Sequence, residues 1–192
     1  PDGTTSAIPV VCNLTASREL CARALGIADH RQSAREFARK TASPIGPEIV
    51  GRAAAPVQEV VREGRDADVT ALPALKQHAG DAGRYITAGH VVTVDPATGI
   101  DNMGIQRLWV REPRLLGFYP YPTSHNWHNI RKFWERGEAC PVAIWIGHHP
   151  AVVMGAQAKI GYPESHWSAA GGAIGEALRI VPSVTHGDRI MV

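Results

Sequence analysis

Apolar and polar residues follow a helical period in the first third of this chain. A serine precedes each of two amphipathic segments, and Gly26 follows the first of them, which is the usual punctuation of short α-helices. A continuous apolar run near the N-terminus is typical of a buried strand. The predicted elements are a strand at 8–11, helices at 18–25 and 34–40, and a short apolar stretch at 57–61. Together they predict a small α/β lobe over residues 1–72.

The period changes toward two after a turn-rich stretch at 78–84, which indicates strands. An Asp-Pro-Ala-Thr-Gly turn at 95–99 separates the first two of them. The predicted elements are strands at 86–94, 102–110, 115–119, 141–146 and 177–184, helices at 125–136 and 150–158, and a loop at 162–167 before a glycine turn at 171–172. Strands joined by hairpins, with helices inserted at the rim, predict a β-barrel or open sheet over residues 73–192. The predicted fold class is therefore α+β.

Composition and charge narrow the class of protein. The chain has 192 residues, of which 44% are hydrophobic and 20% charged, as in an ordinary soluble globular protein. Positive and negative residues nearly balance, and a formal charge of +2 is too small to indicate a nucleic-acid-binding protein. No apolar run is long enough to cross a membrane and no signal peptide is visible, so we predict a cytoplasmic protein with reduced cysteines. The chain opens without a methionine and closes on an apolar strand-like run, so we expect it to be part of a longer protein.

The stretch 101–107 and the helix start near residue 125 hold the most informative combination of polar side chains in the sequence. Asn102 offers an amide oxygen, Arg107 a permanent cation, and Ser124 and His125 a hydroxyl and an imidazole. These groups at a strand and a helix start favour a site for a phosphate and its metal ion. An odd separation puts Asn102 and Arg107 on opposite faces of one strand unless a bulge intervenes. The alternatives are an exposed strand arginine and an ordinary N-cap beside a surface histidine.

Two further metal-capable residues, Glu164 and His166, lie in the predicted loop at 162–167. Either is a possible metal ligand, and either is equally consistent with a solvated loop. The chain contains no G-x-G-x-x-G, P-loop, G-x-S-x-G or H-E-x-x-H pattern. The sequence therefore gives no support to dinucleotide-binding, P-loop, hydrolase or zinc-protease functions.

Short segments spread over nearly the whole chain match one known family in order and spacing. The matching segments are 9–14, 17–18, 72–73, 80–89, 95–99, 102–107, 136–138, 141–144, Gly147 and 150–151. On these segments the chain resembles the UbiD-like decarboxylases. The resemblance implies a flavin-reductase-like split β-barrel that binds prenylated FMN, with manganese and potassium ions near the cofactor phosphate. It also implies a homo-oligomeric carboxy-lyase that adds or removes CO2 on an aromatic or α,β-unsaturated carboxylic acid.

The resemblance also implies roles for individual residues. Asn102 and His125 correspond to metal ligands, and Arg107 corresponds to the catalytic arginine, whose planar cation would orient a carboxylate. The residues expected to contact the cofactor are Asn102, Met103, Gly104, Ile105, Gln106, Arg107, Ser124 and His125.

The chain departs from the family pattern at two places. The family's third metal ligand is a glutamate, but the matching position holds His166, with Glu164 two residues earlier. An imidazole is a poorer partner than a carboxylate for a hard ion. The family's catalytic glutamate comes after the point where this chain ends, so we expect this chain alone to lack the proton donor. The alternative functions are a non-catalytic flavin- or ligand-binding split barrel and a histidine-rich metal-binding scaffold.

Overall fold

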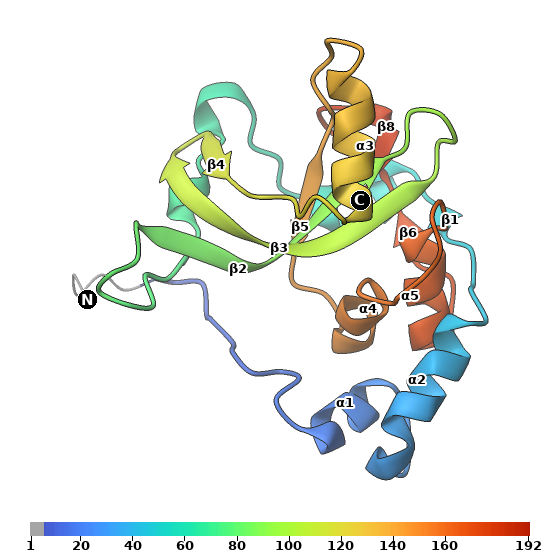
Figure 1. Ribbon diagram of the computed structural model, residues 1–192. Helices are drawn as coiled ribbons and strands as arrows, with labels where there is room; N and C mark the ends of the chain where they lie inside the picture. Colours follow the sequence, from blue (N-terminus) through green and yellow to red (C-terminus); the bar gives the residue numbers. More distant parts are fainter. Residues whose placement is uncertain (1–5) are drawn as a thin grey trace.

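A four-stranded antiparallel sheet organises the structure, a computed structural model that describes residues 6–192 (Figure 1). Its strand order is β4 (Leu115–Gly117), β3 (Asp101–Glu112), β2 (Arg84–Val94) and β5 (Ala143–Ile146). Two smaller pairs complete the strands: β1 (Glu48–Ile49) runs parallel to β6 (Arg179–Ile180), and β7 (Pro182–Ser183) runs antiparallel to β8 (Gly187–Met191). Over residues 6–192 these strands form an open sheet and no closed barrel, so the predicted split barrel is not confirmed.

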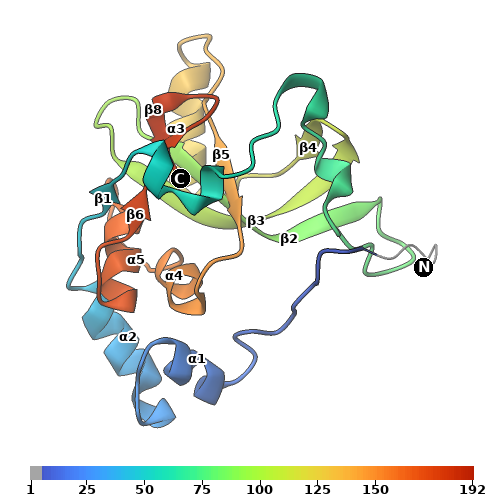
Figure 2. The same cartoon turned by 180° about the vertical axis from the view of Figure 1, so that it is seen from behind.

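Helices cover both faces of the sheet. Figure 1 shows α3 (His125–Trp134) on one side of β2 and β3, and α4 (Pro150–Gly155) with α5 (His166–Ile174) on the other. The view from behind shows α1 (Arg18–Ala24) and α2 (Ser33–Thr41) beyond α4 and α5, away from the sheet (Figure 2). Short 3₁₀ turns occur at His30–Gln32, Arg52–Ala54, Pro56–Gln58, Gly64–Asp66 and Val69–Ala71.

The sheet is buried on both faces because apolar residues occupy consecutive positions of β2. Val91 and Val92 point to opposite faces, and neither has any exposed surface. Val91 packs with Leu108 in one core cluster, and Val92 packs with Trp167 in another. Each such fully buried aliphatic side chain contributes about 1.5–3 kcal/mol relative to exposure. The central strands are therefore a rigid base for the side chains that they carry.

Most of the predicted elements are confirmed. The helices predicted at 18–25, 34–40, 125–136 and 150–158 and the strands predicted at 86–94, 102–110, 115–119 and 141–146 all exist, with shifts of a few residues at their ends. Ser17 caps α1 by accepting a hydrogen bond from the Leu20 N–H at 3.2 Å, as expected for a helix start. The predicted boundary at residue 72 stays a prediction.

Three local predictions were wrong. The apolar run at 8–11 is not a strand, and the strand predicted at 177–184 is divided between β6 and β7. The predicted loop and glycine turn are instead the end of a loop followed by helix α5, which contains both glycines. Gly172 lies inside the helix because a neighbouring segment packs directly on it: a Cβ there would be 2.5 Å from the Lys40 carbonyl oxygen. Close backbone packing, which the local sequence does not reveal, outweighs the low helix propensity of glycine.

No helix within residues 6–192 has the length and apolarity needed to span a membrane.

Candidate functional site

Helix α3 presents two asparagines to the sheet. Its buried residues Asn126, Asn129, Ile130 and Phe133 form the i, i+3, i+4, i+7 stripe of an amphipathic helix. Asn126 is 1% exposed and Asn129 has no exposed surface. Buried amides need hydrogen-bond partners, so polar residues at two core positions of a helix indicate a structured polar site. Asn126 and Asn129 are functional residues that the sequence prediction missed, although two asparagines on the apolar stripe of a predicted helix are a visible signal.

The backbone fixes the orientation of the Asn126 side chain. Its Nδ2 donates to the Val91 carbonyl oxygen at 3.3 Å, which directs its Oδ1 toward Thr93 of β2 and Asn102 of β3. There it accepts from the Thr93 hydroxyl at 2.8 Å. That hydroxyl can give its only proton to Asn126 because it accepts from Asn129 Nδ2 at 3.0 Å. The direction of each hydrogen bond therefore follows from the one before it.

These hydrogen bonds, which run from Asn129 through Thr93 to Asn126, form a polar relay, and this relay sets the direction of the Asn102 amide. Asn102 is 5% exposed on β3 and lies opposite Thr93. Its Nδ2 donates to Asn126 Oδ1, so its oxygen faces His166 Nδ1 across 3.2 Å. The reverse orientation would bring the Asn102 oxygen within reach of the backbone N–H groups of Asn126 and Met103. It would also place two amide oxygens in contact, so we favour the orientation with the oxygen toward His166.

His166 is the first residue of α5 and is 5% exposed. The Asp101 carboxylate holds this helix end in place by accepting from the N–H groups of His166 at 2.9 Å and Trp167 at 3.1 Å. Burial lowers the pKa of His166 to about 4, so its imidazole is neutral at pH 7. A neutral imidazole held against an amide oxygen has the protonation state of a metal ligand.

His125 lies at the start of α3, with its ring centroid 6.0 Å from that of His166. Burial lowers the pKa of His125, and the neighbouring His128 lowers it further. Ser124 is the N-cap of α3: its hydroxyl accepts from the Trp127 N–H at 3.2 Å and donates to the Tyr121 carbonyl at 2.6 Å. The fold therefore places Asn102 and His125 each beside His166 and gives Ser124 a capping role at the start of the same helix as His125.

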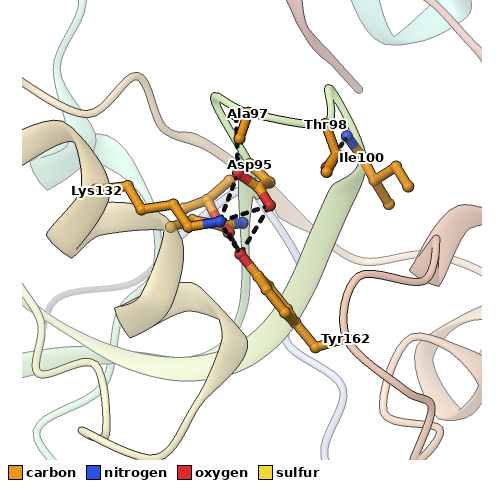
Figure 3. Close-up of polar contacts among 8 residues, drawn as sticks. Asp95, Ala97, Thr98, Ile100, Lys132 and Tyr162 are labelled. Atoms are coloured by element: carbon orange, nitrogen blue, oxygen red, sulfur yellow. Dashed lines mark hydrogen bonds and ion pairs between the residues drawn. The ribbon is translucent and has the colours of Figure 1, made fainter.

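A second polar cluster lies at the other end of the same relay (Figure 3). Lys132 Nζ contacts Asp95 Oδ2 at 2.8 Å and the Tyr162 hydroxyl at 2.9 Å. That hydroxyl lies 2.9 Å from Asp95 Oδ2 and 3.0 Å from Asn129 Oδ1. Burial tends to raise the pKa of Asp95, but hydrogen bonds from Lys132, the Ala97 N–H and Tyr162 outweigh it and hold the pKa at about 2. The Tyr162 ring lies 5.0 Å from the His125 ring, which connects this cluster to the candidate site.

Other residues proposed from the sequence lie outside this buried cluster. Arg107 is exposed and points to the face of β3 opposite Asn102, and a register shift in β2 between Ile86 and Gly89 lies across from it. Among residues 6–192 its guanidinium makes no hydrogen bond or ion pair. Glu164 is exposed as well.

The stretch between Asn102 and Arg107 divides its side chains between the core and the surface. Met103 is 3% exposed, and its sulfur accepts from Trp145 Nε1 at 3.3 Å. Ile105 is 43% exposed, and its N–H donates to Gln157 Oε1 at 3.2 Å. A Cβ at Gly104 would be 3.0 Å from Asn126 Nδ2, so glycine there permits the close approach of α3.

The donor set is compatible with a metal ion only when the amide is included. Within residues 6–192, no group of three or more His, Cys, Asp and Glu side chains is arranged to hold an ion. Asn102 adds an oxygen to the two imidazoles. Because this oxygen faces His166 Nδ1, the lone pairs of the two atoms point toward the same space. The residues thus fit a small divalent cation with one oxygen and two nitrogen ligands.

A separate hollow of about 580 Å³ lies near β8 and the end of β2. Its lining includes Val94, Phe133, Arg136 and Ile190, but none of the site residues proposed from the sequence. It shares with the neighbourhood of the candidate site only Asp95, Asp101 and Trp167. The metal-capable side chains therefore do not belong to this hollow.

Comparison with known proteins gives a consistent result. Residues 48–192 match the family model described as the UbiD 3-octaprenyl-4-hydroxybenzoate carboxy-lyase Rift-related domain. The chain is 29% identical over 184 residues to the anhydromevalonate phosphate decarboxylase of Aeropyrum pernix, which covers 95% of this chain and 39% of that protein. It is 34% identical over 159 residues to the phenolic acid decarboxylase of Streptomyces sp. (strain D7), covering 80% of this chain and 32% of that protein.

Solved structures agree with the sequence comparisons. An evolved dimeric form of the UbiD-class enzyme HmfF from Pelotomaculum thermopropionicum, in complex with prFMN, superposes with a TM-score of 0.89 at 33% identity. The match covers 97% of this chain and 43% of that chain. The chain thus spans less than half the length of these relatives.

Proposed function

This chain belongs to the UbiD family, and we propose that it forms the cofactor-binding part of a prenylated-FMN-dependent decarboxylase. The observation that carries the proposal is the meeting of Asn102, His125 and His166 at the edge of a rigid sheet. An amide oxygen and two imidazoles there fit a divalent ion that would hold the phosphate of a flavin cofactor. We expect manganese and a nearby potassium ion, by resemblance to the family. We also expect residues beyond this chain to complete a split β-barrel and a homo-oligomer.

The proposed cofactor position follows from the free edge of β3. In the part of the chain that the structure describes, β4 pairs only with Trp109–Glu112, and no strand pairs with this edge over Asn102–Arg107. The Ile105 N–H of this stretch donates to Gln157 and Asn126 packs on Gly104, so a flat ring would lie along the backbone that these contacts leave open. Ser124 and His125 begin α3, where the positive end of a helix favours a phosphate. When bound, prenylated FMN would supply the electron sink for loss of CO2.

Arg107 is proposed to orient the carboxylate of the substrate. Its exposed guanidinium makes no ion pair within residues 6–192, so it is available to an anion. A bidentate contact would fix the plane of the carboxylate. The proton donor is proposed to lie outside this chain, as the resemblance implies. The relatives are a phenolic acid decarboxylase and an anhydromevalonate phosphate decarboxylase, so the proposed substrate class is an aromatic or α,β-unsaturated carboxylic acid.

The test is to express the complete protein together with an enzyme that makes prenylated FMN. We expect a coloured protein with bound cofactor and a divalent ion, and release of CO2 from at least one aromatic or enoic acid. Asn102→Ala is expected to lose both the ion and the cofactor, whereas Asn13→Ala, at an exposed site, is expected to retain them. A folded protein that stays colourless and free of metal would contradict the proposal.

The same experiment separates the alternatives. A non-catalytic flavin- or ligand-binding protein would retain the cofactor but release no CO2 from any acid. A histidine-rich metal-binding scaffold would retain its metal in Asn102→Ala, because its ligands would not include the amide.

A further inference from the structure

Glu164 and His166 lie two residues apart, and only one of them is placed to bind the ion. His166 is 5% exposed, and its Nδ1 is 3.2 Å from the Asn102 amide. Glu164 is exposed, and its Oε1 is turned back over its own loop, where a Cβ on Gly161 would be 2.7 Å away. Helix α5 therefore begins by directing an imidazole, not a carboxylate, into the site.

We infer that His166 is the third protein ligand and that the site prefers a borderline divalent ion, such as Co²⁺, Fe²⁺ or Zn²⁺, over the hard ion Mn²⁺. This inference rests on the proposed function and adds the class of metal. A set with one amide oxygen and two imidazoles is richer in nitrogen than a set that contains a carboxylate. Imidazole suits iron, nickel, copper and zinc, while carboxylate and carbonyl oxygen suit magnesium, calcium and manganese.

Hydrogen bonds on both sides hold His166 in this role. The Asp101 carboxylate accepts from its backbone N–H and fixes the start of α5. The Ala158 carbonyl contacts the imidazole and opposes the effect of burial on its pKa. Metal-binding histidines usually have such a backbone partner, which orients the ring. Because the single ring proton of the neutral imidazole goes to the Ala158 carbonyl, Nδ1 keeps its lone pair toward the Asn102 oxygen, where an ion would join the two.

The amide oxygen is equally constrained, because the hydrogen-bond relay through Asn126 points it at His166. His125, 6.0 Å away between ring centroids, supplies the second imidazole. All three donors belong to described, packed elements. The ligand set is thus a property of the fold and does not depend on the exposed loop that carries Glu164.

The experiment compares metal preference in the complete protein with FMN bound. Wild type, His166→Glu and Glu164→Gln are stripped with a chelator, and the dissociation constants for Mn²⁺ and Co²⁺ are measured by calorimetry. Loss of even an indirect partner of a metal ligand changes affinity by about 10- to 100-fold, so we expect His166→Glu to shift the Mn²⁺/Co²⁺ ratio of affinities at least about tenfold toward Mn²⁺. Glu164→Gln is the matched control and is expected to leave the ratio unchanged.

Pulsed electron paramagnetic resonance on bound Mn²⁺ gives a second readout that does not depend on affinity or activity. We expect couplings from two imidazole nitrogens in the wild type and from one in His166→Glu. A single nitrogen in the wild type, or an effect of Glu164→Gln equal to that of His166→Glu, would overturn the inference and leave the proposed function intact. A protein that binds neither FMN nor any of the ions would overturn both.

Discussion

The two ends of the polar relay beneath α3 differ in how completely they are satisfied. At one end, the buried carboxylate of Asp95 has a cation, a hydroxyl and a backbone N–H as partners (Figure 3). At the other end, the Asn102 oxygen meets an imidazole nitrogen that has its own lone pair. Buried polar groups that hold a fold together have complementary partners, whereas groups kept for a ligand are complete only when it binds. The contrast assigns a structural role to the Asp95 end and a binding role to the Asn102 end.

Removing the carboxylate should have the largest effect on stability. Asp95→Ala leaves Lys132 without its partner and Tyr162 with one acceptor fewer. Breaking a buried pair costs about 3–5 kcal/mol, and because the Lys132 side chain is 34% exposed we expect the lower value, about 3 kcal/mol. Denaturant unfolding measures this, with Asp66→Ala at an exposed site as the control. Equal losses in the two variants would remove the structural role assigned to this end.

The acid dependence of stability should identify the same carboxylate. The pKa of Asp95 is about 2 in the folded chain, below its ordinary value of 3.8, so the folded state binds fewer protons. Its contribution, about 2 kcal/mol, is present above pH 4–5 and is lost as the pH falls toward 2. In Asp95→Asn the corresponding part of the pH dependence should vanish. An unchanged acid transition in that variant would show that another group is responsible.

Thr93→Val tests whether the two ends are connected. Valine keeps the shape of the side chain but cannot donate to Asn126 or accept from Asn129. An unsatisfied buried amide costs about 1–3 kcal/mol, and we expect about 1.5 kcal/mol here. Because Asn126 then loses part of its fixed direction, metal affinity should also fall by about tenfold. Unfolding and metal titration measure the two effects. Thr185→Val, at an exposed position, should show neither, and a loss of stability without loss of affinity would separate the two ends.

The sequence revealed the two ends of this relay unequally. Asn102 and His125 could be proposed because an amide and an imidazole beside predicted strand and helix starts suggest a site, whereas His166, in a predicted loop, was matched to a ligand position only by the family resemblance. Asp95 and Lys132 could not be paired, because 37 residues separate them and Asp95 was interpreted only as a turn residue. Helix α5 was missed because its glycines are explained by packing on Lys40 and Ile45, which are distant in sequence. Local periodicity predicted β2, β3 and α3, whereas long-range backbone contacts decided the rest.

The smallest effect should come from Tyr162→Phe, because this change removes one hydroxyl and leaves the Lys132–Asp95 pair in place. The hydroxyl is close to Lys132, Asp95 and Asn129, but the residue is 39% exposed, so water can replace part of what is lost. We expect a loss of about 1 kcal/mol in unfolding and a slightly higher pKa for Asp95, since one of the groups that lower it is gone. The ring stays beside His125, so metal affinity should change much less than in Tyr162→Ala, which removes the ring as well. If the two variants weaken metal binding equally, the hydroxyl and not the ring connects the structural end of the relay to the binding end.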